Sequence, residues 1–156
     1  DIYINIKTIF YFDLSLKMIK YKQKEVLMFK SVKFYNEEFC LKNKDALIVF
    51  GDNLIRIGKG GQACIRDEIN SYGIATKRTP SMDNQAFFGD RADEAHALLN
   101  DIQGLLVVCD SGDFDTIVLP GDKLGTGLAK MEEKSPKLFV WLHETLSLLL
   151  DVDYRV

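Results

Sequence analysis

The chain has 156 residues, of which 47% are hydrophobic, and its formal net charge is -3. These values favour one domain with a buried core, and they argue against an extended nucleic-acid surface, so small anionic ligands are the expected partners. No apolar run reaches transmembrane length, so we expect no membrane partner and a cytoplasmic location.

The amino-terminal segment, residues 1–30, is rich in Ile, Tyr, Phe and Lys and contains neither Gly nor Pro. Its residues follow no clear helical or strand period. Two interpretations stay open: an extension ahead of a natural start at Met18 or Met28, or a first strand over residues 2–12. Residues 31–156 are expected to form a single domain.

Short apolar runs predict the strands of this domain. The predicted strands are residues 26–34, 46–50, 74–77 and 116–120. A further run at residues 105–108 is predicted as a strand, with a helix that continues through Gly104 as the alternative. Between the first two strands, residues 36–38 and 41–45 predict a polar turn and a surface loop.

Apolar residues three or four positions apart predict the helices. The predicted helical segments are residues 63–71, 91–103, 128–133 and 136 onward. Ile65 and Ile69 would share the apolar face of the first helix. Ser135 is the expected cap of the last helix, with Pro136 in its first turn, and His143 is expected to be exposed.

The strand at residues 46–50 leads into the strongest candidate for a ligand site. Gly51, Asp52 and Asn53 follow it, at the carboxyl end where open α/β sheets gather ligand-binding side chains. A glycine-rich turn at residues 58–61 comes next. Glycines remove the Cβ atoms that keep a ligand from the main chain, so consecutive N–H groups can converge on an anion. The alternative is a tight turn without a ligand.

Side chains near this turn could complete the site. Asn53 offers an amide for a ribose hydroxyl or a water molecule, and Lys59 could supply a mobile cation. Farther along the chain, Lys77, Arg78 and Phe88 lie on or near a long loop over residues 78–90. Cations and aromatic rings on one loop can clamp a charged, planar ligand, although solvated charges and a core phenylalanine are the alternative.

A second glycine loop follows the strand at residues 116–120. Residues 121–129 read GDKLGTGLA and combine glycines with one hydroxyl and one cation. The loop repeats the construction of the first one, because an apolar strand again runs into glycine-rich backbone ahead of a short helix. We therefore expect Asp122, Lys123 and the segment 125–127 to contribute to the same kind of site.

In the order of its two glycine loops, the sequence resembles the macrodomain superfamily of ADP-ribose-binding modules. The resemblance rests on Gly51-Asp52-Asn53 followed by Gly-Gly-Gln-Ala at residues 60–63, and on Leu-Gly-Thr-Gly-Leu at residues 124–128. The sequence is also similar to uncharacterised small bacterial and phage proteins with GDN, GKGGQA and GTGLA segments. The resemblance implies a three-layer α/β/α fold with a mixed sheet and helices on both faces, formed by residues 31–156 as one macrodomain-like domain.

The resemblance also implies roles for individual residues. Asn53 would contact the distal ribose, Gly60 and Gly61 would approach the diphosphate or that ribose, and the segment 125–127 would hold phosphate. The full expected ligand-binding set is Gly51, Lys59, Gly60, Gly61, Gln62, Lys77, Arg78, Phe88, Lys123, Gly125, Thr126 and Gly127. The sequence departs from the family where Asn-Ala-Ala-Asn is replaced by the residues 50–53, Phe-Gly-Asp-Asn, and where Gln62 stands at a usually apolar position.

Two main functions are compatible with these residues. The first is hydrolysis of an ADP-ribosyl or related nucleotide-ribose bond, in which Asn53 orients the ribose and Asp52 or Asp122 positions water or acts as a base. The second is binding of an ADP-ribose-like nucleotide, free or on a macromolecule, without chemistry. A protein that acts through its surface is a third possibility. We expect neither a metal nor a cofactor.

Overall fold

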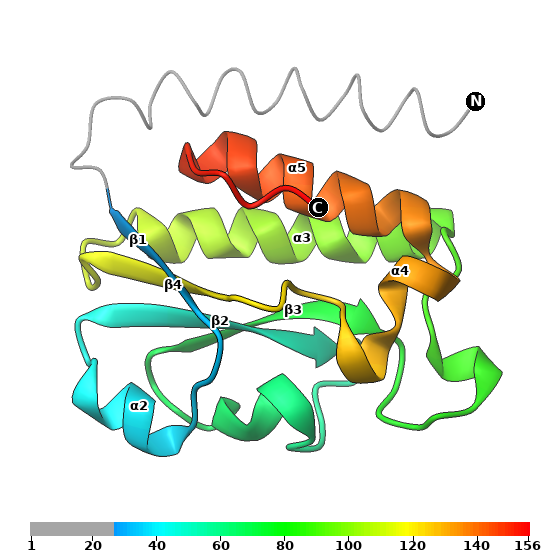
Figure 1. Cartoon of the computed structure of the whole chain (residues 1–156), viewed down its shortest axis with the longest axis horizontal. Coiled ribbons are helices and arrows are strands. Elements are labelled where there is room, and N and C mark those ends of the chain that lie inside the picture. The colour runs from blue at the N-terminus through cyan, green and yellow to red at the C-terminus, as the bar shows by residue number, and fades with distance from the viewer. Residues whose placement is uncertain (1–26) are drawn as a thin grey trace.

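The computed structural model describes residues 27–156, and a parallel sheet lies at their centre (Figure 1). The strands are β1 (Met28–Val32), β2 (Ala46–Asn53), β3 (Ser71–Lys77) and β4 (Thr116–Pro120), in the order β1-β4-β2-β3. The four predicted strands are confirmed. The predicted mixed sheet is wrong for the described residues, because the pairings β1–β4, β2–β4 and β2–β3 are all parallel. The possible strand at residues 2–12 lies outside the described residues.

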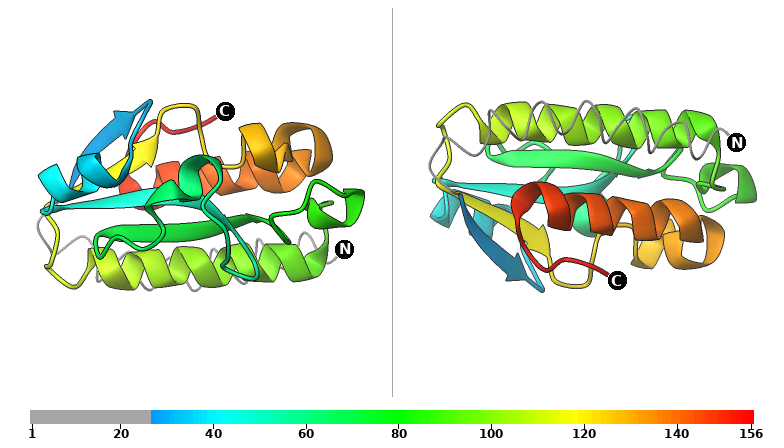
Figure 2. Two further views of the ribbon diagram at one scale, coloured as in Figure 1. Left: turned by 90° about the horizontal axis from the view of Figure 1, so that it is seen from below. Right: turned by 90° about the horizontal axis from the view of Figure 1, so that it is seen from above.

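Helices lie on both faces of the sheet (Figures 1 and 2). The α-helices are α2 (Glu37–Lys42), α3 (Ala92–Cys109), α4 (Met131–Lys134) and α5 (Pro136–Leu150), and the 3-10 helices are η1 (Gly61–Ile65), η2 (Asn84–Ala86) and η3 (Gly127–Ala129). In Figure 1, α3 and α5 cover one face, while α2 and η1 lie against the other. None of the helices described in residues 27–156 is long and apolar enough to cross a membrane.

Strand β2 is buried on both faces and separates two apolar clusters. Leu47 and Val49 pack in the cluster formed with α3 and α5, whereas Ile48 and Phe50 pack in the cluster beside α2 and η1. Successive side chains of a strand point to opposite faces, so a continuous apolar run serves both clusters. This double burial makes β2 the strand that positions the site at its carboxyl end.

Helix α3 extends through the segment that was predicted as a strand. Residues 105–108 belong to this helix, since the burial of Ile102, Leu105 and Cys109 continues its helical period. The helix has a glycine at position 104 because a Cβ there would collide with the Tyr72 hydroxyl of β3. The helical alternative is therefore the correct one.

Two predictions for loops and helices around β2 are wrong. The predicted polar turn and the start of the predicted surface loop form α2, which begins where the Phe39 N–H donates to Asn36 Oδ1 at 2.9 Å. The predicted helix over residues 63–71 is reduced to η1, and Ile69 is 92% exposed. The chain turns just before β3, where the buried Asn70 Nδ2 donates to the main-chain carbonyl oxygens of Cys40, Asn43 and Ala46.

Ser135 occupies the N-cap position of α5 and Pro136 lies in its first turn, as predicted, but the capping hydrogen bonds come from Asp90. The Asp90 carboxylate accepts hydrogen bonds from the Lys137 and Leu138 N–H groups at 3.2 Å and 2.9 Å. Ser135 makes no side-chain cap of its own, and its Oγ donates to Asp90 Oδ1 at 2.8 Å. The predicted cap is therefore corrected: the helix start is satisfied by a carboxylate from a distant loop, which also suits the positive end of the helix dipole.

His143 is fully buried, which corrects the prediction that it is exposed. Its Nδ1 lies 2.7 Å from the Phe139 carbonyl oxygen, and its Nε2 has no hydrogen-bond partner among the described residues. The ring packs between Phe139 and Tyr154, at centroid distances of 4.6 Å and 5.2 Å. Burial lowers the pKa of His143 to about 4 because the charged imidazolium would lose its hydration.

The burial of His143 predicts a loss of stability in mild acid. The group binds a proton more weakly in the folded chain than in the unfolded chain, where its pKa is 6.5, so its contribution is present above that pH and is lost as the pH falls towards 4. The lost contribution is about 3 kcal/mol. Urea unfolding at pH 7 and pH 4 should show a smaller pH dependence for His143→Phe than for the parent. The control His96→Phe, at an exposed position, should keep the parental pH dependence.

Candidate functional site

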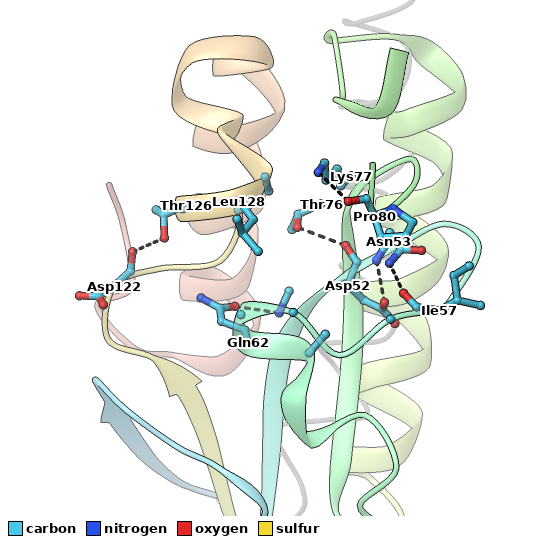
Figure 3. A pocket seen from close by; sticks show the side chains of 18 residues that line it. Asp52, Asn53, Ile57, Gln62, Thr76, Lys77, Pro80, Asp122, Thr126 and Leu128 are labelled. Atoms are coloured by element: carbon cyan, nitrogen blue, oxygen red, sulfur yellow. Dashed lines mark hydrogen bonds between the residues drawn. The ribbon is translucent and has the colours of Figure 1, made fainter. Parts of the chain in front are cut away.

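A pocket of about 300 Å³ lies at the carboxyl ends of β2 and β3, between the two glycine loops (Figure 3). The residues that line it are Gly51, Asp52, Asn53, Ile57, Gly58, Gly60, Gly61, Gln62, Ala63, Thr76, Lys77, Pro80, Asp122, Gly125, Thr126, Gly127, Leu128 and Ala129. The fold thus brings together most of the site residues expected from the sequence. Their convergence follows from the parallel sheet, because β2, β3 and β4 end at the same edge.

A register shift between β2 and β3 shapes this pocket. Asp52 pairs with Ala75, but Asn53 pairs with Lys77 instead of Thr76, so β3 contains one extra residue. A bulge of this kind redirects the side chains at a strand end. Laterally paired residues of a parallel sheet point to the same face, so the bulge brings Lys77 beside Asn53.

Asn53 presents an unused hydrogen-bond acceptor. Its Nδ2 donates to the Ile57 carbonyl oxygen at 2.8 Å, which holds the first glycine loop near the strand end. Its Oδ1 is buried and has no hydrogen-bond partner among the described residues. A buried acceptor without a donor destabilises the fold by about 1–3 kcal/mol, and a hydroxyl of a ligand would remove that cost.

Lys77 is a buried cation in the same pocket. The side chain belongs to a residue that is only 5% exposed, and its Nζ lies 3.5 Å from the Pro80 carbonyl oxygen and 3.3 Å from Met82 Sδ. Within residues 27–156 it forms no ion pair with a carboxylate. Burial lowers the pKa of Lys77, and repulsion from Lys130 lowers it further. The pocket therefore contains an amine that an anion would stabilise in its charged form.

Asp52 is held by two arginines that the sequence did not single out. Its Oδ1 accepts from Arg66 Nη2 at 2.5 Å and its Oδ2 accepts from Arg66 Nη1 at 2.8 Å. Arg56 Nη1 lies 3.4 Å from Oδ2. Because both carboxylate oxygens are engaged, the geometry favours a positioning role for Asp52, and its catalytic role stays a prediction.

Gln62 connects the two glycine loops. Its Oε1 accepts from the Gly51 N–H at 2.8 Å, and its Nε2 donates to the Lys123 carbonyl oxygen at 3.2 Å. A Cβ at position 51 would lie 2.9 Å from Gln62 Oε1, so a larger residue there would displace this amide. The Gln62 amide therefore joins the strand end to the second loop.

The second loop supplies an exposed carboxylate and a hydroxyl. Asp122 is exposed and lies across the pocket from Asn53 (Figure 3). The Thr126 Oγ donates to the carbonyl oxygens of Asp122 and Lys123 at 3.0 Å and 3.1 Å, so it shapes the turn. The described residues contain no group of three His, Cys, Asp or Glu side chains that could hold a metal ion.

Four of the expected ligand-binding residues do not line this pocket. Lys59 pairs with Asp67 at 2.6 Å on the surface, and Lys123 Nζ lies 4.2 Å from the centroid of the Tyr154 ring. Arg78 pairs with acidic residues at the start of α3. Phe88 is buried in the core cluster beside α3. Their roles as ligand contacts receive no support from their positions.

Leu128 is a pocket residue that the sequence analysis did not assign. It is half-exposed, and a Cβ added at Gly60 or Gly61 would lie 3.5 Å or 3.3 Å from its Cδ1. The side chain of the second loop therefore lies against the main chain of the first. Its place directly after the Gly-Thr-Gly segment of the second loop was a usable signal, whereas nothing in the local sequence indicated the pairing of Arg66 with Asp52.

The Asp52 pair predicts a large effect on stability. Asp52→Ala would leave the mostly buried Arg66 guanidinium without its carboxylate, so we expect the free energy of unfolding to fall by about 3 kcal/mol in urea titrations. The matched control Asp67→Ala removes a carboxylate from an exposed ion pair and should change stability little. Equal effects of the two substitutions would contradict the role assigned to Asp52.

Comparisons with known proteins identify a family without assigning an activity. No curated protein and no solved structure matches the chain significantly. A family of unknown function (DUF7831) matches residues 30–145, which include both glycine loops and every element from β2 to η3. The chain therefore belongs to the family of unknown function DUF7831.

Proposed function

We propose that the pocket binds ADP-ribose or a related nucleotide-ribose, and that the protein hydrolyses an ADP-ribosyl bond. The observation that carries the proposal is the buried Oδ1 of Asn53, which has no hydrogen-bond partner in the described residues and belongs to a residue that lines a pocket between two glycine loops. A ribose hydroxyl would donate to this oxygen. The main chain of both loops would accommodate the phosphates that accompany such a ribose.

The size and charge of the pocket support a nucleotide-ribose. A volume of about 300 Å³ lies at the lower end of the range for ligand pockets, roughly 300–1,000 Å³. It therefore suits a ribose and adjoining phosphate, with the rest of the ligand over the open rim. The buried ammonium of Lys77 favours an anionic ligand, and no carboxylate is paired with it among the described residues.

Hydrolysis needs a group that can accept a proton from water near the ribose. Asp52 is engaged by Arg66 through both oxygens, and Asp122 lies at the exposed side of the pocket. Lys77 is buried beside Asn53, and its lowered pKa increases the fraction of neutral amine. We assign it the role of base, or of the group that positions the attacking water.

The macrodomain arrangement of three layers is part of the same proposal. The helices on both faces of the sheet support it, as does the position of both glycine loops at the carboxyl ends of the strands, whereas the all-parallel order of the described strands differs from the expected mixed sheet. The second candidate function is a module that binds the same nucleotide without turnover. The two-point pairing of Asp52 favours this alternative, since it withdraws one of the two expected catalytic carboxylates.

Asn53→Ala tests the ribose contact. The substitution should weaken ADP-ribose binding about tenfold, because it removes an acceptor whose hydrogen bond to the ligand contributes roughly 1–3 kcal/mol. Isothermal titration calorimetry with ADP-ribose measures the change. Asn100→Ala, at an exposed position of α3, is the control and should bind like the parent. Parental affinity in Asn53→Ala, or no binding of ADP-ribose by the parent, would remove the proposal.

Lys77→Met separates catalysis from folding. The methionine is also unbranched and is only one atom shorter, but it removes a buried charge without a counter-ion, so the melting temperature should not fall. Release of ADP-ribose from a modified protein or nucleic acid should fall at least about a hundredfold if Lys77 transfers the proton. Binding with unchanged turnover would contradict the role of Lys77. Binding by the parent without any turnover would favour the non-catalytic alternative.

A further inference from the structure

The residues after α5 fold back onto the loop that follows β4. Helix α5 ends at Leu150, and Asp151 follows with a positive φ of 53°. The Tyr154 N–H then donates to Ser147 Oγ of the helix at 2.9 Å. Both views of Figure 2 show the carboxyl-terminal residues beside the loop after β4. The tail, residues 151–156, is thus held on α5 and lies at the start of the second glycine loop.

The side chain of Tyr154 contacts this loop in two ways. Its hydroxyl donates to the Pro120 carbonyl oxygen at 2.6 Å, and the centroid of its ring lies 4.2 Å from Lys123 Nζ. The same carbonyl oxygen accepts from the Lys123 N–H at 3.0 Å, which closes a turn over residues 120–123. Tyr154 therefore contacts both ends of the turn from which the second glycine loop begins.

The backbone of Lys123 is strained. Its φ is 75°, in the left-handed region that residues with a Cβ rarely adopt. Its ammonium lies over the Tyr154 ring, where a cation–π contact stabilises it, and Lys123 does not line the pocket. The cation of the second loop therefore helps to hold the turn in place instead of contacting the ligand.

The Lys123 carbonyl oxygen connects this turn to both glycine loops. It accepts from Gln62 Nε2 at 3.2 Å, and Gln62 Oε1 in turn accepts from the Gly51 N–H of β2. It also accepts from Thr126 Oγ at 3.1 Å, within the second loop. Gln62 and Thr126 both line the pocket. A different orientation of the Lys123 peptide would therefore change contacts on both sides of the pocket.

The other end of the second loop is held by α4. The Met131 N–H donates to the Gly125 carbonyl oxygen at 2.8 Å. A Cβ at Gly125 would lie 2.5 Å from Met131 Sδ, so the main chain of the loop passes close to this side chain. Residues 125–127 therefore lie between the turn that Tyr154 contacts and the start of α4, and loss of the Tyr154 contact would release one side of them.

We propose that Tyr154 is a positioning residue of the candidate site, which fixes the turn at residues 120–123 and thereby the main-chain N–H groups of residues 125–127. Tyr154 is 1% exposed and does not line the pocket, so it acts through the loop and not on the ligand. A loop that is already ordered binds its ligand without the entropic cost of ordering. That these N–H groups hold phosphate rests on the proposed function.

Tyr154→Phe tests the proposal, because it removes the hydroxyl that reaches Pro120 and keeps the ring next to Lys123. The matched control is Tyr35→Phe, which removes a buried tyrosine hydroxyl that donates to the Val49 carbonyl oxygen in the middle of β2, at 3.1 Å. Each substitution deletes one buried hydrogen bond to the main chain, so similar losses of stability are expected in urea titrations. A merely structural role of Tyr154 would make the two variants behave alike.

Hydrogen–deuterium exchange and isothermal titration calorimetry with ADP-ribose are the two measurements. In Tyr154→Phe, the amides of residues 121–127 should exchange about three- to tenfold faster than in the parent, and the affinity for ADP-ribose should fall by a similar factor. Tyr35→Phe should match the parent in both. Unchanged exchange in Tyr154→Phe overturns the proposal, whatever the affinity, and so does an equal change in the two variants.

The two measurements also separate this proposal from the proposed function. If the parent does not bind ADP-ribose, the proposed function fails, while faster exchange of residues 121–127 in Tyr154→Phe alone still supports the positioning of the loop. If the parent binds ADP-ribose and Tyr154→Phe binds it with parental affinity, the proposed function stands and the positioning role of Tyr154 fails.

Discussion

The carboxylate of Asp52 holds the first glycine loop against the sheet. Its two oxygens accept from Arg66, whose Nε also donates to the Gly58 carbonyl oxygen at 2.7 Å. Arg56 connects the same carboxylate to Asp101 of α3, at 2.6 Å, and Asp101 Oδ2 accepts from the Ala75 N–H of β3 at 2.7 Å. One buried charge thus joins the loop, the edge strand and α3. Because the pair is largely removed from water, the loop has few alternative positions of similar energy.

Because the first glycine loop is held in place, the pocket can contain polar groups that have no hydrogen-bond or ion-pair partner within the described residues. The Asn53 Oδ1 has no hydrogen-bond partner, and the Lys77 ammonium has no paired carboxylate, among the described residues. Both features reduce stability, and both would be relieved by one anionic, hydroxyl-bearing ligand. Asn53 and Lys77 are paired across the β2–β3 bulge, so the two destabilising groups belong to neighbouring positions of the sheet. This coincidence is the physical basis of the proposed nucleotide-ribose site.

The opposite wall of the pocket depends on contacts from the second glycine loop. Gln62 joins the Gly51 N–H to the Lys123 carbonyl oxygen, and Leu128 lies against the glycines of the first loop. The same loop continues into α4 and brings Lys130 and Lys134 to Phe87. The pocket wall and the positions of Lys130 and Lys134 are therefore two consequences of one chain path.

Local composition was sufficient to predict the strands and both glycine loops. The run at residues 46–50 is apolar throughout because β2 is buried on both faces, and most glycines of both loops adopt a positive φ that other residues disfavour. The same reasoning placed Asn53 and Lys77 in a candidate site before their contacts were known. These features depend on each segment's own residues, so they can be inferred without knowing its neighbours.

Contacts between distant segments decided the rest. Arg66 reaches Asp52 only after η1 turns the chain, Asp90 caps a helix that begins 46 residues later, and His143 is buried by packing against Tyr154. The helical period across residues 105–108 became clear from burial against the sheet, since a short apolar run suits a strand or a helix equally well. The geometry of ion pairs, the register of paired strands and the desolvation of buried groups arise when separate elements meet. The tertiary structure alone therefore determined them.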